Sequence, residues 1–191
     1  MMKDIRILLT LTLSVLFGLT SCEETTEAGE FDNWKERNTL YIDSIAAEAR
    51  ANTGDWKIFL EDGLDASKEW GNEHYVYCLV MEEGTGVEHP LYTDSVLVNY
   101  SGRLIPSATY PYGYQFDSSY KGEFNPSFNV PVGMPLSGTV PGFSTAVQHM
   151  VDGDVWKVYI PYQLGYGEST SASIPAYSTL IFDINLVSFY R

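Results

Sequence analysis

Alternating apolar and polar residues mark the second half of the chain as a series of β-strands. The clearest alternation lies in residues 179–189, TLIFDINLVSF, where Leu180, Phe182 and Ile184 fall on one face. Successive side chains of a strand point to opposite sides of its sheet, so this strand has one apolar face. Shorter strand-like runs occupy residues 75–81, 95–104 and 155–160.

Residues 33–51 have the apolar spacing of an amphipathic helix, with steps of three to four residues over most of their length. The residues that carry this spacing are Trp34, Tyr41, Ile45 and Ala49. Asp32 or Asn33 is expected to cap the start of the helix. The helix either packs on the domain that follows or pairs with a second copy of the chain, and the sequence leaves both arrangements open.

A second, short helix is predicted over residues 142–150, where Phe143 and Val147 fall on one apolar face and Pro141 stands just ahead. Residues 55–73 lack a regular period, and residues 105–115 are rich in proline and tyrosine, so both segments are expected to be irregular. Many strands with one short internal helix predict an α+β domain, in which that helix covers the apolar face of an antiparallel sheet.

The first 21 residues have the features of a secretory signal peptide. A basic start precedes an apolar run of about 13 residues, which is too short to span a bilayer. The sequence Leu-Thr-Ser-Cys at 19–22 resembles a bacterial lipobox, whose cysteine becomes the acylated first residue of the mature chain. We therefore expect removal of residues 1–21, lipidation of Cys22 and a flexible acidic tether over residues 22–31. The alternative is an ordinary signal peptide with an incidental cysteine.

The composition argues against two classes of partner. With 25 acidic and 11 basic residues the chain carries a net charge of −14, and loss of residues 1–21, which hold two basic residues and one acidic residue, leaves −15. Such a chain lacks the basic clusters that bind nucleic acid or anionic lipid, so we expect membrane contact through the lipid anchor only. Cys78, the other cysteine, lies in an apolar run and is expected to be buried and unpaired.

The sequence lacks the patterns of metal-dependent and hydrolytic chemistry. His74, His89 and His149 do not share the spacing of metal ligands. No glycine-rich phosphate loop with its lysine and no nucleophile elbow is present. We expect neither a metal nor a cofactor.

Five blocks of the second half resemble, in order and with similar gaps, the FKBP-type peptidyl-prolyl cis-trans isomerases. They are VLVNYSGRL (96–104), FDSS (116–119), VPGFSTAVQHMVDGD (140–154), YIPYQLGYG (159–167) and IPAYSTLIFDINL (174–186). The resemblance covers residues 75–191 and implies a bent antiparallel sheet half-wrapped around the short helix, with a pocket between them. It divides the chain into a signal peptide (1–21), a tether (22–31), an N-terminal helical extension (32–74) and an isomerase domain (75–191).

The resemblance also implies which residues form the site. Those implied to act on the substrate amide are Tyr100, Asp117, Tyr166 and Phe182. Those implied to bind the surrounding polypeptide are Phe116, Phe128, Val140, Phe143 and Ile174. Tyr100 is the expected hydrogen-bond donor to a buried Asp117, since an unpaired buried carboxylate is costly. Two departures from the family pattern are Phe143, where the family usually has tryptophan, and a longer loop at 105–115.

The implied activity is cis-trans isomerisation of X-Pro bonds in envelope or secreted proteins. Proline-containing polypeptides are the implied partners, macrolide-type ligands are further candidates, and the N-terminal helix is a candidate homodimer contact. The implied location is the bacterial cell envelope, at the outer membrane and facing either the periplasm or the exterior. Two alternatives stay open: a non-catalytic peptide-binding or chaperone module on the same fold, and a structural envelope lipoprotein with an incidental pocket.

Overall fold

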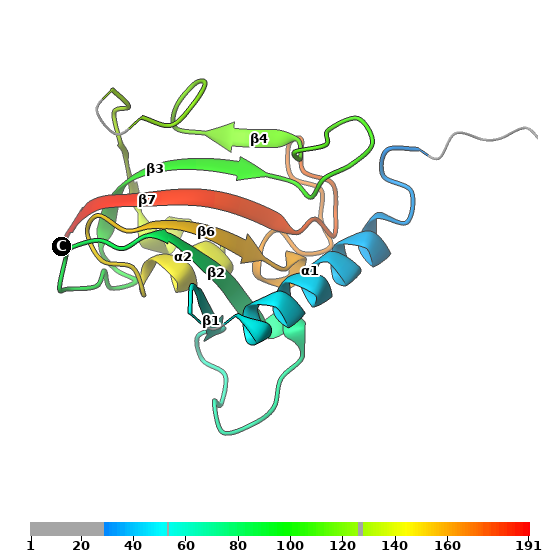
Figure 1. Cartoon of the computed structure of the whole chain (residues 1–191), viewed down its shortest axis with the longest axis horizontal. Coiled ribbons are helices and arrows are strands. Elements are labelled where there is room, and N and C mark those ends of the chain that lie inside the picture. The colour runs from blue at the N-terminus through cyan, green and yellow to red at the C-terminus, as the bar shows by residue number, and fades with distance from the viewer. Residues whose placement is uncertain (1–28, 53, 126–127) are drawn as a thin grey trace, which may run out of the picture.

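The computed structural model describes residues 29–191 apart from residues 53 and 126–127. The expected signal peptide, Cys22 and all but the last residues of the expected tether lie outside the described residues. One antiparallel sheet forms the body of the described chain, and two helices pack against it (Figure 1). Neither of these helices is long and apolar enough to cross a membrane.

The described residues form a sheet of seven strands. These are β1 (Trp56–Leu60), β2 (Tyr75–Glu82), β3 (Ser95–Arg103), β4 (Gln115–Ser118), β5 (Val132–Pro135), β6 (Val155–Ile160) and β7 (Leu180–Tyr190). Their order is β1-β2-β6-β7-β3-β4, and β5 also pairs with β3. The strands β4 and β5 share one edge of β3, because β4 pairs with residues 101–103 and β5 with residues 95–98.

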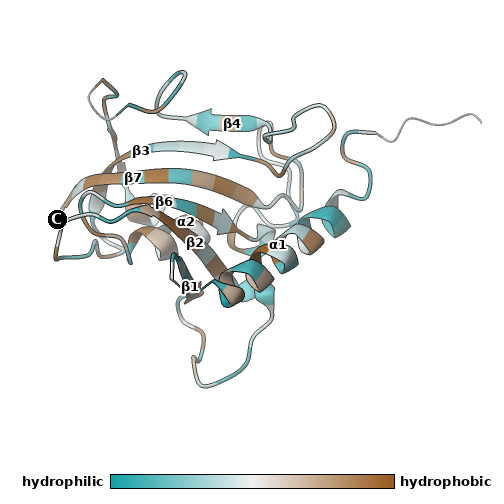
Figure 2. Cartoon of the chain, in the orientation of Figure 1, coloured by the Kyte–Doolittle hydropathy of each residue, from teal (hydrophilic) through white to brown (hydrophobic). Residues whose placement is uncertain are grey.

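Strand β2 is apolar on both faces because a helix covers each of them. Val76 and Cys78 belong to the main core with residues of α2 (Pro141–Val147). Tyr77, between them in sequence, points to the other face and packs in a second cluster with Ile45 of α1 (Trp34–Ala51). The sequence YVYCLVM therefore shows little alternation, as is usual for a strand buried on both sides. In Figure 2 apolar residues run along β2, β6 and β7.

Helix α2 packs closely on the sheet. A side chain at Gly142 would place its Cβ 2.3 Å from a side-chain carbon of Ile160, so only glycine allows this approach. The helix covers residues 141–147, which is shorter than the predicted 142–150. Three short 3₁₀ helices connect the elements: η1 (Asn72–His74), η2 (Leu136–Gly138) and η3 (Tyr162–Leu164).

Helix α1 packs on the sheet, on the side of β1 and β2, so the first of the two predicted arrangements is observed. Figure 1 shows it crossing the sheet near these strands. Asn33 is the N-cap residue, but it has a φ of 52° and its side chain makes no capping hydrogen bond. Asp32 instead accepts a hydrogen bond from the Gly29 N–H at 2.7 Å. The predicted side-chain cap is therefore wrong.

The prediction of an irregular segment over residues 55–73 is wrong for residues 56–60, which form β1. This strand pairs with β2 in register from Trp56–Leu79 to Leu60–Tyr75. Trp56 is buried against α1 and stacks on Tyr159 at 5.6 Å between ring centroids. Its strand conformation is thus stabilised by contacts with distant residues, which a local pattern does not report.

Candidate functional site

A cavity of about 300 Å³ opens between the start of α2 and the strands β3, β4 and β7. The lining residues are Tyr100, Asp117, Met134, Gly138, Thr139, Val140, Phe143, Tyr166 and Phe182. Six of them are among the nine predicted site residues. The three others, Met134, Gly138 and Thr139, lie on β5, η2 and the link to α2. Gly138 and Thr139 directly precede Val140 in the sequence. This adjacency is the only sequence feature that indicates a place for them in the site.

Three aromatic rings in mutual contact form the base of the cavity, and two of the three ring pairs are edge-to-face. Phe143 and Phe182 have ring centroids 5.3 Å apart and an interplanar angle of 81°. Tyr100 lies 6.3 Å from Phe143 and 6.2 Å from Phe182. Phe143 and Phe182 are buried at 4% and 7% exposure, so their positions are fixed by the core rather than by solvent-facing contacts. Such packed rings supply a rigid apolar surface.

The predicted hydrogen bond between Tyr100 and Asp117 is confirmed. The Tyr100 hydroxyl donates to Asp117 Oδ2 at 2.7 Å, and the other carboxylate oxygen accepts from the Ser118 N–H at 2.8 Å. Burial, and next the bond to Asp117, raise the pKa of Tyr100 above its usual value, so the hydroxyl stays a donor. The predicted burial of Asp117 is wrong, because its side chain is exposed at the cavity mouth.

A β-bulge in β4 explains how Phe116 and Asp117 serve one site. Gln115 pairs with Arg103 and Asp117 with Gly102, which leaves Phe116 as the extra residue of the bulge. The Phe116 ring packs edge-on against Phe182 at 5.6 Å, beside the cavity. A Cβ at Gly102 would lie 2.6 Å from Phe116 and 2.7 Å from Phe182, so the absent side chain makes room for both rings.

Val140 offers a backbone donor at the cavity wall. Its carbonyl accepts hydrogen bonds from the amides of Phe143 and Ser144, which begins α2. Within the described part of the chain its own N–H has no hydrogen-bond partner. Tyr166, 42% exposed on the loop after η3, brings a hydroxyl to the same cavity. The site thus combines an apolar base with a few polar groups at its rim.

Three predicted residues do not line this cavity. Phe128 is 83% exposed, because it stands in a turn before β5 rather than on the strand. Ile174 is buried in the core at 5% exposure, and Phe116 supports Phe182 from outside. Phe128 and Ile174 are therefore not brought to this cavity, and Phe116 contributes to it only through its contact with Phe182. A role of these three residues in substrate binding stays a prediction.

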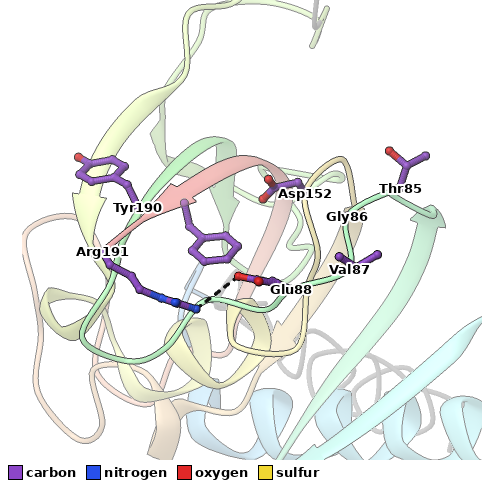
Figure 3. Close-up of a pocket in the computed structure, with 8 residues that line it drawn as sticks. Thr85, Gly86, Val87, Glu88, Asp152, Tyr190 and Arg191 are labelled. Carbon is purple, nitrogen blue, oxygen red and sulfur yellow. Dashed lines mark hydrogen bonds and ion pairs between the residues drawn. The ribbon is translucent and has the colours of Figure 1, made fainter.

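A larger cavity, about 580 Å³, lies at the far end of β7 (Figure 3). Glu88 and Arg191 form an ion pair across it at 3.4 Å, and both side chains are more than half exposed. Burial raises the pKa of Asp152 at its edge. This cavity is open and charged, and it lacks the packed rings of the Tyr100 site, so it is not the candidate site.

Residues of metal or thiol chemistry do not gather near the rings. Among the described residues there is no group of three or more histidine, cysteine or acidic side chains that could hold a metal ion. Cys78 is fully buried, as predicted, and has no disulfide partner within the described part of the chain. Burial raises the pKa of its thiol far above the usual range. A thiol in that state is a poor nucleophile.

An apolar cavity with a few polar groups at its rim is the usual form of a ligand-binding site in a protein. The chain belongs to the FKBP-type peptidyl-prolyl cis-trans isomerase family, whose model matches residues 86–187, more than half of the sequence. The antiparallel sheet around α2 and the additional helix α1 agree with the predicted α+β fold.

Curated relatives and a solved structure agree with this assignment. The peptidyl-prolyl cis-trans isomerase Mip of Coxiella burnetii is 38% identical over 110 residues, which are 57% of this chain and 42% of that protein. The outer membrane protein MIP of Legionella longbeachae is 36% identical over 162 residues, 84% of this chain and 58% of that one. The crystal structure of a peptidyl-prolyl cis-trans isomerase from Pseudomonas syringae superposes with a TM-score of 0.58 at 25% identity, covering 82% of this chain and 96% of that one. The chain spans about half the length of these two curated relatives.

Proposed function

We propose that the protein is a peptidyl-prolyl cis-trans isomerase that acts on proline-containing polypeptides. The observation that carries this proposal is the base of packed rings, Phe143, Phe182 and Tyr100, beside the Val140 N–H. This N–H has no hydrogen-bond partner among the residues that the structure describes. The family match over residues 86–187 supports it. A prolyl ring fits an apolar cavity of about 300 Å³, and the adjacent donors suit the carbonyl groups next to it.

The physical basis is the difference between the planar and the twisted amide. Rotation about an X-Pro bond meets a barrier of about 18–20 kcal/mol, because the planar amide is stabilised by resonance. The twisted amide loses this resonance and its carbonyl becomes less polar. A water-poor aromatic site therefore binds the twisted form better than the planar one, and only such differential binding accelerates the step. No nucleophile, metal or cofactor is needed.

Each residue then has a role. Phe143 is the floor under the prolyl ring and Phe182 is a wall, with Phe116 holding Phe182 in place. Val140, through its N–H, and Tyr166, through its hydroxyl, bind carbonyl groups of the polypeptide. Asp117 accepts the Tyr100 hydrogen bond and presents its negative field at the mouth, next to the substrate carbonyl carbon.

An isomerisation assay tests the proposal. The purified full chain is mixed with a series of X-Pro peptides, and the cis-to-trans rate is compared with the rate in buffer. Acceleration supports the enzyme. A chain that binds these peptides without accelerating any of them is a peptide-binding or chaperone module. The exposed tyrosines of the inserted loop favour this second function, since Tyr112 is 87% and Tyr110 41% exposed. A macrolide added to the same assay tests whether such ligands occupy the cavity.

We also propose that the protein is a lipid-anchored protein of the cell envelope, with Cys22 as the acylated residue after removal of residues 1–21. The name of the Legionella relative, an outer membrane protein, is the supporting comparison. Metabolic labelling with a radioactive fatty acid should label the parent and leave Cys22→Ser unlabelled. Equal labelling of the parent and Cys22→Ser would contradict the proposal that Cys22 is the lipidated residue. Light scattering on the chain with and without residues 23–54 tests whether α1 also supports a homodimer.

A further inference from the structure

The loop at 165–179, which carries Tyr166, has an unusual backbone. Tyr177 has a φ of 64° and Gly167 a φ of 66°, and the Tyr177 N–H donates to the Gly167 carbonyl at 2.9 Å. A tyrosine in this left-handed region is strained, so its conformation persists only where neighbouring groups hold it. The neighbours that hold this loop come from α1, more than 100 residues earlier.

Two buried hydrogen bonds fasten the end of this loop to α1. The Trp34 Nε1–H donates to Ser178 Oγ at 2.8 Å, and Ser178 Oγ in turn donates to the Pro175 carbonyl at 2.7 Å. Asn38 is fully buried, and its side-chain oxygen accepts from the Thr179 N–H at 2.7 Å. Both contacts join the first turns of α1 to the residues that lead into β7.

Lys35 contacts the same loop nearer to Tyr166. Its Nζ lies 4.4 Å from the centroid of the Tyr177 ring and 3.9 Å from Glu168 Oε1. Tyr177 also stands edge-on to Tyr162 of η3 at 5.3 Å. A cation over the face of a tyrosine attracts that ring. Lys35 thus stabilises the residue with the strained backbone and pairs with the acid two residues after Tyr166.

The segment before α1 also contacts the inserted loop at 105–115. Glu30 accepts a hydrogen bond from the Thr109 hydroxyl of the inserted loop, and its carbonyl accepts from Arg37 Nη1 at 2.9 Å. In Figure 1 the segment before α1 runs past the β3–β4 loop on the same side as the loop before β7. The first turns of α1 therefore have a fixed position from which to hold the Tyr166 loop.

We propose that α1 is a positioning element for the isomerase site, in which Trp34, Lys35 and Asn38 hold the 165–179 loop so that Tyr166 stands over the cavity. This inference rests on the proposed function. Without these contacts the loop samples other conformations, and Tyr166 meets the polypeptide less often. Because Tyr166 binds the substrate in its ground state as well as in its transition state, the loss appears mainly in KM.

Hydrogen exchange on the full chain tests the physical link. Trp34→Phe keeps one aromatic ring of the buried side chain but removes the Nε1–H donor together with the rest of the indole. Lys35→Met removes the charge, with Lys35→Arg as the conservative rescue. The amides of Gly167 and Tyr177 should exchange roughly two- to tenfold faster in Trp34→Phe and Lys35→Met, the effect of one lost hydrogen bond. Exposed Glu36 on the same turn gives the matched control, Glu36→Gln, which should leave these amides unchanged. Unchanged exchange in all variants overturns the proposal.

A double-mutant cycle tests the link to the site. Trp34→Phe should raise KM for X-Pro peptides roughly two- to tenfold with a smaller change in kcat, and Tyr166→Phe should raise it on its own. If Trp34 acts through Tyr166, Trp34→Phe should change KM little further when it is introduced into the Tyr166→Phe variant. Additive effects of the two substitutions overturn the positioning role. A parent that accelerates no peptide contradicts the proposed function instead, and the exchange experiment still decides whether α1 holds the loop.

Discussion

The Tyr100 hydroxyl donates a 2.7 Å hydrogen bond to Asp117 Oδ2, joining the middle of β3 to an exposed carboxylate on the bulged strand β4. The carboxylate is held from its other oxygen by the Ser118 N–H. This arrangement orients a negative charge at the mouth of an apolar cavity without burying it. Substitutions of Asp117 can therefore test the function of the pair without disturbing the core.

Substitution of Asp117 should reduce activity more than stability. We expect Asp117→Leu to lower kcat/KM by about tenfold or more, as for loss of a hydrogen bond to a charged group, because the carboxylate field and the Tyr100 bond are both removed. The thermal midpoint should change little, since Asp117 is exposed. Peptide isomerisation kinetics and thermal unfolding check this. The control is exposed Glu123→Gln, and an unchanged rate in Asp117→Leu would show that the site is assigned wrongly.

Phe182 should matter for both stability and activity. Phe182→Ala removes a ring that contacts Phe143, Phe116 and Tyr100, and we expect a loss of about 3–5 kcal/mol in unfolding free energy. Phe182→Leu keeps apolar volume and should cost less stability while still lowering kcat/KM, because the flat wall is lost. Urea unfolding combined with the assay separates the two effects. A fully active Phe182→Leu variant would contradict the role of the ring as a wall.

Gly102 tests whether the bulge and the rings form one unit. In Gly102→Ala the new methyl group would stand 2.6–2.7 Å from carbons of Phe116 and Phe182, so the rings must shift. We expect a loss of about 1–3 kcal/mol in unfolding free energy, together with a rise in KM. Gly133→Ala on β5 is the matched control, because its Cβ would have ordinary contacts from 3.4 Å outward. Equal free energies of unfolding for the two variants would show that the rings can shift without loss of stability.

Stability should fall in alkaline solution because buried tyrosines resist ionisation. Burial raises the pKa of Tyr77, whose hydroxyl donates to the Asn72 carbonyl at 3.0 Å, from 10.0 to about 12. Between pH 10 and 12 the unfolded chain has released this proton while the native chain retains it. The stabilising contribution of Tyr77 is thus fully present and independent of pH below pH 10. Above pH 10 the free energy of unfolding falls, by at most about 1.4 kcal/mol per pH unit.

Urea unfolding across this pH range checks the sign and the residue. Tyr41, Tyr100, Tyr120 and Tyr159 also have raised pKa values and contribute in the same direction. The free energy of unfolding of the parent should fall steeply with pH. In Tyr77→Phe the slope against pH should be smaller by about the contribution of one proton. Tyr112→Phe, at a position 87% exposed, should keep the parent's slope. Equal slopes in all three proteins would contradict the burial effect at Tyr77.

Local patterns were sufficient for the longest elements. The alternation in residues 179–189 places Phe182 and Ile184 on the buried face of β7, as observed, because a strand with one apolar face reports its period directly. The spacing in residues 33–51 likewise predicts α1 to within one residue at its start. Resemblance to the family added the identity of the site, and six of the nine predicted residues meet at one cavity.

Other features depend on distant contacts. The strand β1 forms because β2 supplies its hydrogen bonds and α1 covers Trp56, and neither partner is visible in residues 56–60 alone. The family pattern places Phe128 on a strand, but Phe128 lies in a turn before β5 and is exposed to solvent. The exposure of Asp117 follows from the bulge in β4, which exists only through pairing with β3.

The sequence by itself determined the family, the main strands, both helices and most of the predicted residues that line the candidate cavity, because periodicity and ordered motifs are local properties. Only the tertiary structure decided that α1 packs on the sheet and joins the Tyr166 loop through Trp34 and Asn38. These contacts link residues more than 140 positions apart. Their energy depends on buried geometry that forms when the chain folds, and neither residue carries a local pattern that predicts its partner.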